Sequence, residues 1–184
     1  MEPSDWDLVQ KCQAGEKSAF QELVSRYHQK VYMVILGLLG NREDALEVAQ
    51  ETFLRVFRKI DGFHGGSSFY TWIYRIAVNL AIDAQRRRKR DRLEFHENLD
   101  GLLESQNEVA RDPFGDVHDR ELREHLIQAI NGLTPEHKAV IVLRTIEGLS
   151  YKDIGEILGC SEGTVMSRLH YARKKLQDKL NSFL

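Results

Sequence analysis

The sequence contains few of the residues that mark β-sheet, metal-binding or secreted proteins. Its 184 residues include three prolines and two cysteines, and no run of alternating Val, Ile and Thr is closed by hairpin turns. Cys12 and Cys160 form neither a Cys-x-x-Cys pair nor a zinc-ligand set with nearby histidines. We therefore expect two reduced thiols in a cytosolic protein, with no metal and no cofactor.

Long apolar runs and catalytic motifs are also missing. The best apolar stretch, residues 31–40, has the length of a buried helix segment and is too short to cross a bilayer. The acidic, polar start MEPSDWDLVQ does not have the pattern of a secretory signal. No paired carboxylates, phosphate-binding glycine loop or Ser–His–Asp set is recognisable, so the sequence predicts a protein that is not an enzyme.

Charge is distributed unevenly, although the formal net charge is only −2. Residues 86–92, RRRKRDR, carry six positive charges and one negative charge, and a second basic zone follows at residues 168–179. Between the two zones, residues 94–124 hold ten acidic and three basic side chains. This distribution predicts two binding sites for a polyanion, one in each half of the chain.

Apolar periodicity predicts an all-α protein made of two small helical domains joined by a flexible acidic linker. We expect the domains at residues 1–93 and 117–184, with the linker at 94–116. Asn41 is typical of an N-cap, and Pro135 of a first helical position. The expected helices cover about residues 5–13, 18–39, 41–60 and 68–92 in the first domain, and 117–131, 135–147, 150–158 and 161–181 in the second.

The last two helices have the spacing of a helix-turn-helix. The turn consists of Gly159, Cys160 and Ser161, and the following helix has one narrow apolar stripe of Val165, Leu169, Ala172 and Leu176. Its opposite face is small and polar at the N-terminal end and basic further along, which suits the major groove of duplex DNA. The alternative is an amphipathic helix with a solvated basic face.

Two helices of the first domain also have faces that are not needed for the core. The helix at 41–60 presents Glu47, Glu51 and Leu54 outward, which fits either a docking patch for a basic partner or an ordinary solvated face. The helix from residue 68 carries Arg75 and Asn79 opposite its apolar stripe, but Val78 and Ile82 share that face, which is unusual for a solvated surface. A glycine-containing loop followed by a polar, basic helix favours single-stranded DNA, whereas a plain nucleic-acid tether or a solubilising helix end is the alternative.

Together these segments resemble the extracytoplasmic-function (ECF) type of bacterial RNA polymerase sigma factors. The motifs that carry the resemblance are AFQELVSRY, EVAQETFLRVF, FHGGSSFYTWIYRIAVNLAID and LTPEHKAVIVLRTIEGLSYKDIGEILGCSEGTVMSRLHYARKKL, in this order along nearly the whole chain. The resemblance implies a sigma region 2 bundle, a linker directed to the RNA exit path, and a sigma region 4 helix-turn-helix domain. It also implies a factor without catalytic activity that selects promoters for core RNA polymerase.

The resemblance assigns site residues as follows. Binding of the clamp helices of core polymerase is expected from Asp44, Glu47, Gln50, Glu51 and Leu54. Capture of the −10 element, including a flipped base of the non-template strand, is expected from Phe63, His64, Ser67, Ser68, Thr71, Tyr74, Arg75, Asn79, Arg86 and Arg87. Recognition of the −35 duplex is expected from Tyr151, Lys152, Ser161, Gly163, Thr164, Met166, Ser167, Arg168, His170, Tyr171, Arg173 and Lys174.

Partners and location follow from the same resemblance. Expected partners are core RNA polymerase (the β′ clamp helices and the β flap), promoter DNA in duplex and single-stranded form, and an anti-sigma factor. The protein is expected in the bacterial cytoplasm, or held at the inner membrane through an anti-sigma factor. His64, Met166 and Tyr171 stand where the family often has arginine, so the preferred promoter sequences cannot be copied from relatives.

Two other classes of protein compete with this interpretation. An ordinary DNA-binding regulator would use only the helix-turn-helix, and would bind duplex DNA without polymerase and without the loop at 63–68. An RNA-binding or structural basic protein would bind without sequence preference, mainly through residues 86–92.

Overall fold

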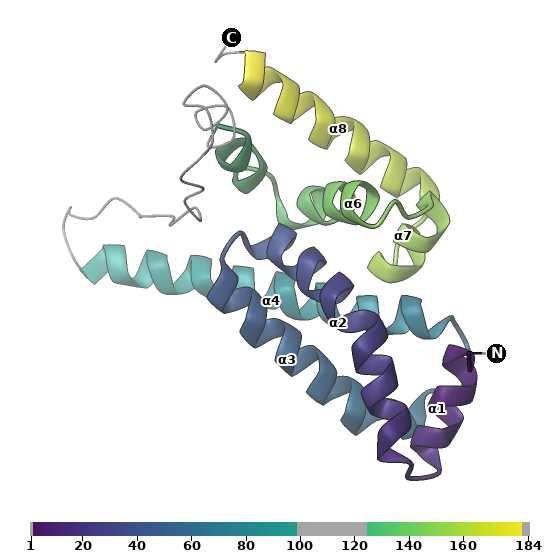
Figure 1. The fold of residues 1–184 in the computed structure, drawn as a ribbon. Helices are drawn as coiled ribbons and strands as arrows, with labels where there is room; N and C mark the ends of the chain where they lie inside the picture. The colour runs from purple at the N-terminus through teal and green to yellow at the C-terminus, as the bar shows by residue number, and fades with distance from the viewer. Residues whose placement is uncertain (1, 99–124, 182–184) are drawn as a thin grey trace, which may run out of the picture.

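A computed structural model describes residues 2–98 and 125–181, and this part of the chain is helical without β-strands (Figure 1). The first domain contains α1 (Asp5–Gln13), α2 (Lys17–Leu39), α3 (Arg42–Lys59), a short 3-10 turn η1 (Ile60–Gly62) and α4 (Phe69–Asn98). The second contains a helical segment at 125–131, α6 (Pro135–Ile146), α7 (Tyr151–Leu158) and α8 (Glu162–Asn181). The all-α class predicted from the sequence is confirmed.

Helix ends follow from local chemistry and agree closely with the expected ones. The side chains of Asn41, Thr134 and Ser150 each accept a hydrogen bond from the backbone N–H three residues on, which satisfies a donor left free in the first turn. Gly40 and Gly159 close α2 and α7 in the left-handed conformation that glycine adopts without steric cost.

One boundary differs from the prediction. Helix α4 was expected to end near residue 92, and it continues to Asn98, so the first five residues of the predicted linker, 94–98, are helical. The remainder of the predicted linker, 99–116, and residues 117–124 of the predicted helix lie outside the described residues. Residues 125–131 of that helix are helical as expected.

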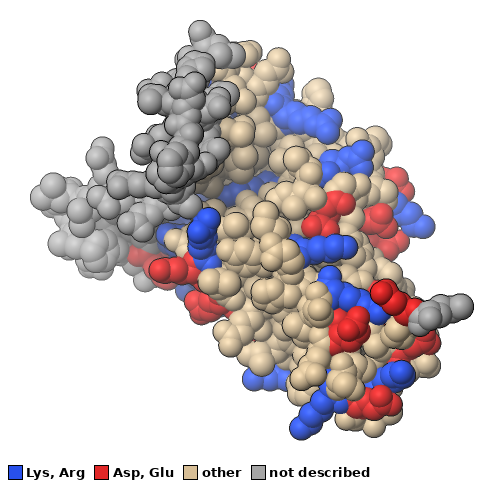
Figure 2. Space-filling model, viewed as in Figure 1, with Lys and Arg blue, Asp and Glu red and all other residues tan. Residues whose placement is uncertain are grey.

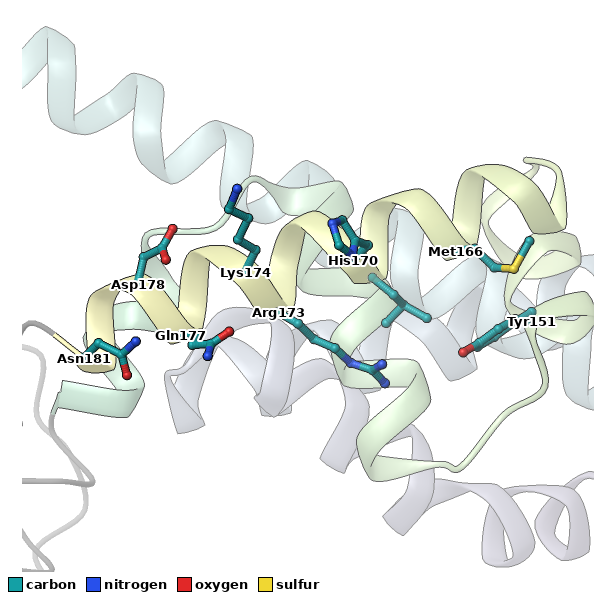
Figure 3. A pocket seen from close by; sticks show the side chains of 9 residues that line it. Tyr151, Met166, His170, Arg173, Lys174, Gln177, Asp178 and Asn181 are labelled. Atoms are coloured by element: carbon teal, nitrogen blue, oxygen red, sulfur yellow. The ribbon is translucent and has the colours of Figure 1, made fainter.

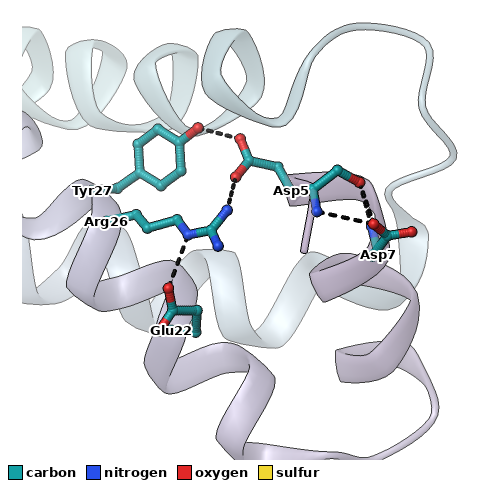
Figure 4. Close-up of polar contacts among 6 residues, drawn as sticks. Asp5, Asp7, Glu22, Arg26 and Tyr27 are labelled. Atoms are coloured by element: carbon teal, nitrogen blue, oxygen red, sulfur yellow. Dashed lines mark hydrogen bonds and ion pairs between the residues drawn. The ribbon is translucent and has the colours of Figure 1, made fainter. Parts of the chain in front are cut away.

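Helix α1 is fastened to the first domain by polar contacts at both ends. The hydroxyl of Tyr27 donates to the carboxylate of Asp5, and Arg26 lies 3.2 Å from the same carboxylate and 3.0 Å from Glu22 (Figure 4). At the other end, Nε2 of Gln13 donates to the carbonyl oxygens of Ile60 (2.8 Å) and Phe63 (2.9 Å). These contacts fix α1 against α2 and against the loop that precedes α4.

The two domains share one continuous apolar core. Helix α2 packs on α6, and α4 packs on both α6 and α7 (Figure 1). Gly37 allows the approach of α2 to α6, because a Cβ atom there would lie 2.8 Å from Ile146 Cδ1 and 3.1 Å from Val142 Cγ1. None of the described helices is both long and apolar enough to cross a membrane.

A lysine lies in the interior of the second domain. Lys138 of α6 is 1% exposed, and its Nζ donates to Oδ1 of Asn131 at 2.8 Å. Burial lowers the pKa of Lys138 from 10.5 to about 8, because a charged ammonium loses its hydration there. Keeping the Lys138 ammonium charged in the interior therefore lowers the free energy of unfolding of the domain at neutral pH.

We expect Lys138→Met to stabilise the protein at pH 7 by up to about 3 kcal/mol, since each pKa unit corresponds to about 1.4 kcal/mol. In the wild type, the unfolded chain binds more protons than the folded chain between about pH 8 and 10.5, so this group makes stability rise with pH in that window. The advantage of the variant should therefore shrink between pH 7 and pH 10, as measured by urea unfolding. Lys30→Met, at an exposed position of α2, is the control; an equal advantage at both pH values would contradict the prediction.

Candidate nucleic-acid and polymerase interfaces

Helix α8 is held by its apolar stripe and presents a polar face outward. Val165, Leu169 and Ala172 are buried as predicted, and Leu176 is half-buried. Ser161 begins the helix, since its Oγ accepts from the backbone N–H of Thr164 at 3.2 Å. The sequence analysis missed Gly155 of α7: a Cβ atom there would lie 2.7 Å from the carbonyl oxygen of Cys160, so glycine is needed for the turn to close against α7.

The outward face of α8 carries most of the residues predicted to read the −35 duplex. Exposed members are Lys152, Ser161, Gly163, Met166, Ser167, His170, Tyr171, Arg173 and Lys174. Tyr171 is 62% exposed. Tyr151, Thr164 and Arg168 are half-buried, and Arg168 donates to Sγ of Cys160 at 3.7 Å. Arg168 is thus directed to the turn in this arrangement.

A hollow of about 570 Å³ runs along one side of α8 (Figure 3). Tyr151 and Met166 line one end, and His170, Arg173 and Lys174 line the middle. Gln177, Asp178 and Asn181 extend it beyond the predicted set. Five of the predicted −35 residues, from α7 and α8, therefore line one concave, partly basic surface.

The predicted −10 residues do not all lie on one accessible surface. His64, Ser68, Arg75, Asn79, Arg86 and Arg87 are exposed, and Ser67 is half-buried. Phe63, Thr71 and Tyr74 are buried in this arrangement, so their contact with DNA stays a prediction that requires the surrounding segments to move.

Each of the three buried residues has a structural reason. Phe63 lies in an aromatic cluster, with its ring centroid 4.9 Å from that of Trp72 and 6.0 Å from those of Trp6 and Phe69. Thr71 is in the first turn of α4, where its backbone N–H donates to Ser68 Oγ.

Tyr74 is covered from the side of the second domain. Burial, together with the carboxylate of Glu147 just after α6, raises the pKa of its phenol above the ordinary value. The projection of an isolated helix could not show this, because the covering residues lie far along the chain.

The second domain also engages the predicted cations of α4. Nη2 of Arg75 donates to the carbonyl oxygen of Glu156 in α7 at 2.9 Å, and Nη2 of Arg86 lies 3.3 Å from Oε1 of Glu136 in α6. Val78 is fully buried, which explains an apolar residue on this face. In this arrangement, α6 and α7 cover part of the surface that the sequence predicts to bind single-stranded DNA.

The outer face of α3 is open as predicted for a docking patch. Glu47, Gln50 and Leu54 are exposed, with Leu54 at 42%. Leu46 and Phe57, which the sequence analysis did not assign, are exposed on the same helix. An acidic surface with three large apolar side chains has the composition of a protein interface.

Asp44 and Glu51, the two half-buried members of this patch, already have partners. Asp44 lies 2.7 Å from Arg88 of α4, and Glu51 lies 2.8 Å from Arg55. The Arg55 guanidinium lowers the pKa of Glu51 from its ordinary value. A hollow of about 690 Å³ lies between α3 and α4. Asn41, Glu43 and Glu47 line it from the side of α3, and Arg87 and Arg88 line it from the side of α4.

Charge on the visible surface is mixed. Figure 2 shows acidic and basic side chains interspersed around a broad uncharged area, without one continuous basic face. On this face, nucleic-acid binding would therefore depend on local sites more than on a uniform positive field.

A four-helix unit followed by a helix-turn-helix unit is the architecture of a two-domain DNA-binding protein, and comparison with known proteins makes this specific. Residues 23–91 match the family Sigma-70 region 2, and residues 123–176 match the family Sigma-70, region 4. The ECF RNA polymerase sigma-E factor of Haemophilus influenzae is 38% identical, over 98% of this chain and 97% of its own length. The ECF RNA polymerase sigma factor SigW of Bacillus subtilis is 37% identical over 94% of both chains.

The chain belongs to the ECF sigma factors of bacterial RNA polymerase, as the sequence motifs predicted. Two solved structures share its fold. RpoE of Bartonella quintana, in a complex with the anti-sigma factor NepR, has a TM-score of 0.69 at 25% identity and covers 88% of this chain and 96% of its own. CnrH, in a complex with the cytosolic domain of CnrY, has a TM-score of 0.69 at 24% identity and covers 95% and 96%.

We expect Gly37→Leu to separate the two domains, because its side chain would meet Val142 and Ile146 of α6 at the closest approach of α2. The substitution favours the α2 helix itself, since glycine is about 0.8–1 kcal/mol less favourable than alanine in a helix interior and leucine is close to alanine. Small-angle X-ray scattering should therefore show a larger radius of gyration with unchanged helix content. Ser25→Leu, at an exposed position of the same helix, is the control; an unchanged radius of gyration for Gly37→Leu would contradict the prediction.

Proposed function

We propose that this ECF sigma factor binds core RNA polymerase and directs it to promoters by reading a −35 duplex and capturing the −10 non-template strand. It performs no chemistry itself, and RNA synthesis belongs to the polymerase. The observation that supports the proposal best is that both sigma regions are present in order, with an open polar face on α8 of the second.

The −35 role is assigned to α8 and the start of α7. Ser167, His170 and Tyr171 project from the exposed face, where side chains can reach base edges in the major groove. Arg173 and Lys174 lie further along the helix beside the hollow, where they can contact phosphates. Base contacts provide sequence preference, and phosphate contacts provide salt-dependent affinity.

The −10 role is assigned to the loop at 63–68 and the exposed side of α4. His64, Ser67 and Ser68 offer polar groups on the loop, and Arg75, Asn79 and Arg87 continue along the helix. Because Arg75 and Arg86 are held by the second domain, α6 and α7 must move away from α4 before the strand can follow this path. Binding of core polymerase that favours separated domains would thereby couple polymerase binding to promoter melting.

The polymerase-binding role is assigned to the outer face of α3. Glu47, Gln50 and Leu54 are open to a partner, while Asp44 and Glu51 are held by neighbouring arginines. An acidic face around an exposed leucine is suited to a basic helical partner. Leu46 and Phe57 extend the apolar part of this face.

Control by an anti-sigma factor is the last part of the proposal. RpoE of Bartonella quintana was solved with the anti-sigma factor NepR, and this chain shares its fold and a quarter of its residues. A partner that keeps the domains closed would hold the factor inactive in the cytoplasm, or at the inner membrane if the partner is anchored there. Affinity purification from the source cell should recover a small protein in addition to polymerase; recovery of polymerase alone would count against this control.

In vitro transcription tests the proposal directly. The protein is added to sigma-free core polymerase with a pool of genomic promoter fragments, and the 5′ ends of the transcripts are sequenced. Discrete start sites that share two upstream elements are expected. Binding to duplex DNA without specific initiation would instead favour an ordinary regulator, and sequence-independent binding dominated by residues 86–92 would favour a general basic protein.

Substitutions in α8 should separate base reading from phosphate binding. We expect alanine at Ser167, His170 or Tyr171 to weaken binding of the preferred −35 duplex by about 1–3 kcal/mol for each base that is no longer read, with little effect on unrelated duplexes. Alanine at Arg173 or Lys174 should weaken binding of the preferred and the unrelated duplexes alike. It should also reduce the slope of the logarithm of the binding constant against the logarithm of the salt concentration by about 0.9. Holoenzyme titrations at several salt concentrations measure both effects, and an identical response of the two groups of variants would refute the assignment.

Substitutions on α3 should affect polymerase binding alone. We expect Glu47→Lys combined with Leu54→Ala to weaken binding to core polymerase at least about tenfold, because a negative charge and an apolar side chain of the proposed interface are removed together. Lys30→Glu, a charge reversal on α2, is the control. Competition for core polymerase against a labelled wild-type factor gives the affinities, and unchanged competition by the double variant would exclude this face.

A further inference from the structure

An exposed aromatic ring beside the loop at 63–68 comes from α1, near the start of the chain. Trp6 of α1 is 42% exposed, and its Cζ3 and Cη2 atoms lie 3.2 and 3.4 Å from the position that a Cβ atom of Gly65 would occupy. Its ring centroid is 6.0 Å from that of Phe63. The indole therefore covers the buried Phe63 and leaves part of its own surface open next to the loop.

The position of this ring is fixed by its surroundings. Ser4 and Asp7 cap the start of α1 reciprocally, and Asp5 is tied to Tyr27 and Arg26 of α2 (Figure 4). At the far end, Gln13 holds the carbonyl oxygens of Ile60 and Phe63, directly before the loop. Helix α1 thus connects the ring and the loop as one unit, so the exposed surface of the indole is pre-organised.

The loop itself has hydrogen-bonding groups and one small ring, the exposed imidazole of His64, and the indole of Trp6 is the larger aromatic surface beside it. Residues 64–68 are His, Gly, Gly, Ser and Ser, and Gly65 has a φ of +75°, which glycine tolerates and which leaves room for the indole. Phe63 and Trp72, aromatic residues at the start of the loop and in α4, pack against each other at 4.9 Å inside the cluster. An unpaired base held by this loop needs a stacking partner as well as hydrogen bonds.

We propose that Trp6 is a contact residue for the melted promoter, and that an unpaired base of the non-template strand stacks on its exposed ring at the edge of the loop. The inference rests on the proposed capture of the −10 strand and adds a residue from α1 to it. Stacking on tryptophan tolerates any base, so Trp6 contributes affinity for the melted strand, while the loop contributes the choice of base.

The test compares three holoenzymes assembled from core polymerase and full-length factor: wild type, Trp6→Phe and Trp6→Leu. Leucine keeps an apolar cover over Gly65 and Phe63 without an aromatic face, whereas phenylalanine keeps a smaller aromatic face. The probe is a single-stranded oligonucleotide with the −10 sequence of a promoter that the wild-type factor uses, with 2-aminopurine at each position in turn. Affinity and 2-aminopurine fluorescence are both recorded, and binding of the −35 duplex is recorded in parallel.

We expect Trp6→Leu to bind the single strand about 5- to 100-fold more weakly, because the aromatic surface on which the base stacks is removed. Trp6→Phe should retain most of the affinity, and one 2-aminopurine position should lose its quenching in Trp6→Leu. Binding of the −35 duplex should not change. Met33→Leu, at another exposed large apolar residue, should behave as wild type.

Three outcomes would overturn the inference. Wild-type affinity in both Trp6 variants would show that the ring does not contact the strand. An equal loss in Trp6→Phe and Trp6→Leu, with no 2-aminopurine position affected, would assign Trp6 a packing role alone. Failure of the wild-type holoenzyme to bind the single strand would instead refute the proposed −10 function, and the inference with it.

Discussion

Helix α4 is apolar on two opposite sides, and the arrangement of the molecule follows from the need to cover both. Phe69, Ile73 and Ala77 face the core of the first domain, while Tyr74 and Val78 are buried as well. The elements that contact α4 from outside its own domain are α6 and α7. Because apolar burial is worth about 25 cal/mol per Å², covering this second side of α4 stabilises its contact with the second domain. Helix α4 therefore contributes residues to the core of the first domain, to the contact between the domains and to the proposed path of the DNA strand.

This double use makes the domain contact suitable for regulation. Its polar parts are weak, because the Arg86–Glu136 pair is exposed to water and such pairs contribute about 0–1 kcal/mol. Its apolar part is continuous with the core of both domains, and Gly37 lies at a close approach of α2 to α6. A partner that binds only the separated form has to supply the free-energy difference between the closed and the separated arrangements. A partner that binds only the closed form stabilises the closed form further. Under the proposed function, polymerase and an anti-sigma factor would thus act on one equilibrium in opposite directions.

The first domain also shows how a loop can be prepared for a ligand before the ligand binds. Gln13 and Trp6 lie at the two ends of one nine-residue helix and contact the loop at 60–65 from both. A loop held only by its own backbone would have to lose conformational entropy on binding, which costs about 1–2 kcal/mol per residue fixed. Helix α1 reduces that cost in advance, which gives a physical reason for a short helix ahead of the bundle.

The sequence by itself determined the helices, the helix-turn-helix and the family, because caps, apolar stripes and turn lengths act within a few residues of each other. It also predicted the open faces of α8 and α3, since each of those helices has one apolar stripe and an outer face that the described structure leaves largely open. Only the tertiary structure decided that Phe63, Thr71 and Tyr74 are buried and that Trp6 is exposed beside the loop. Those outcomes depend on contacts between segments tens of residues apart, which helical periodicity does not encode. For the same reason, the sequence showed that Val78 is an apolar residue on a polar helix face, but only the contact with the second domain explains why it is there.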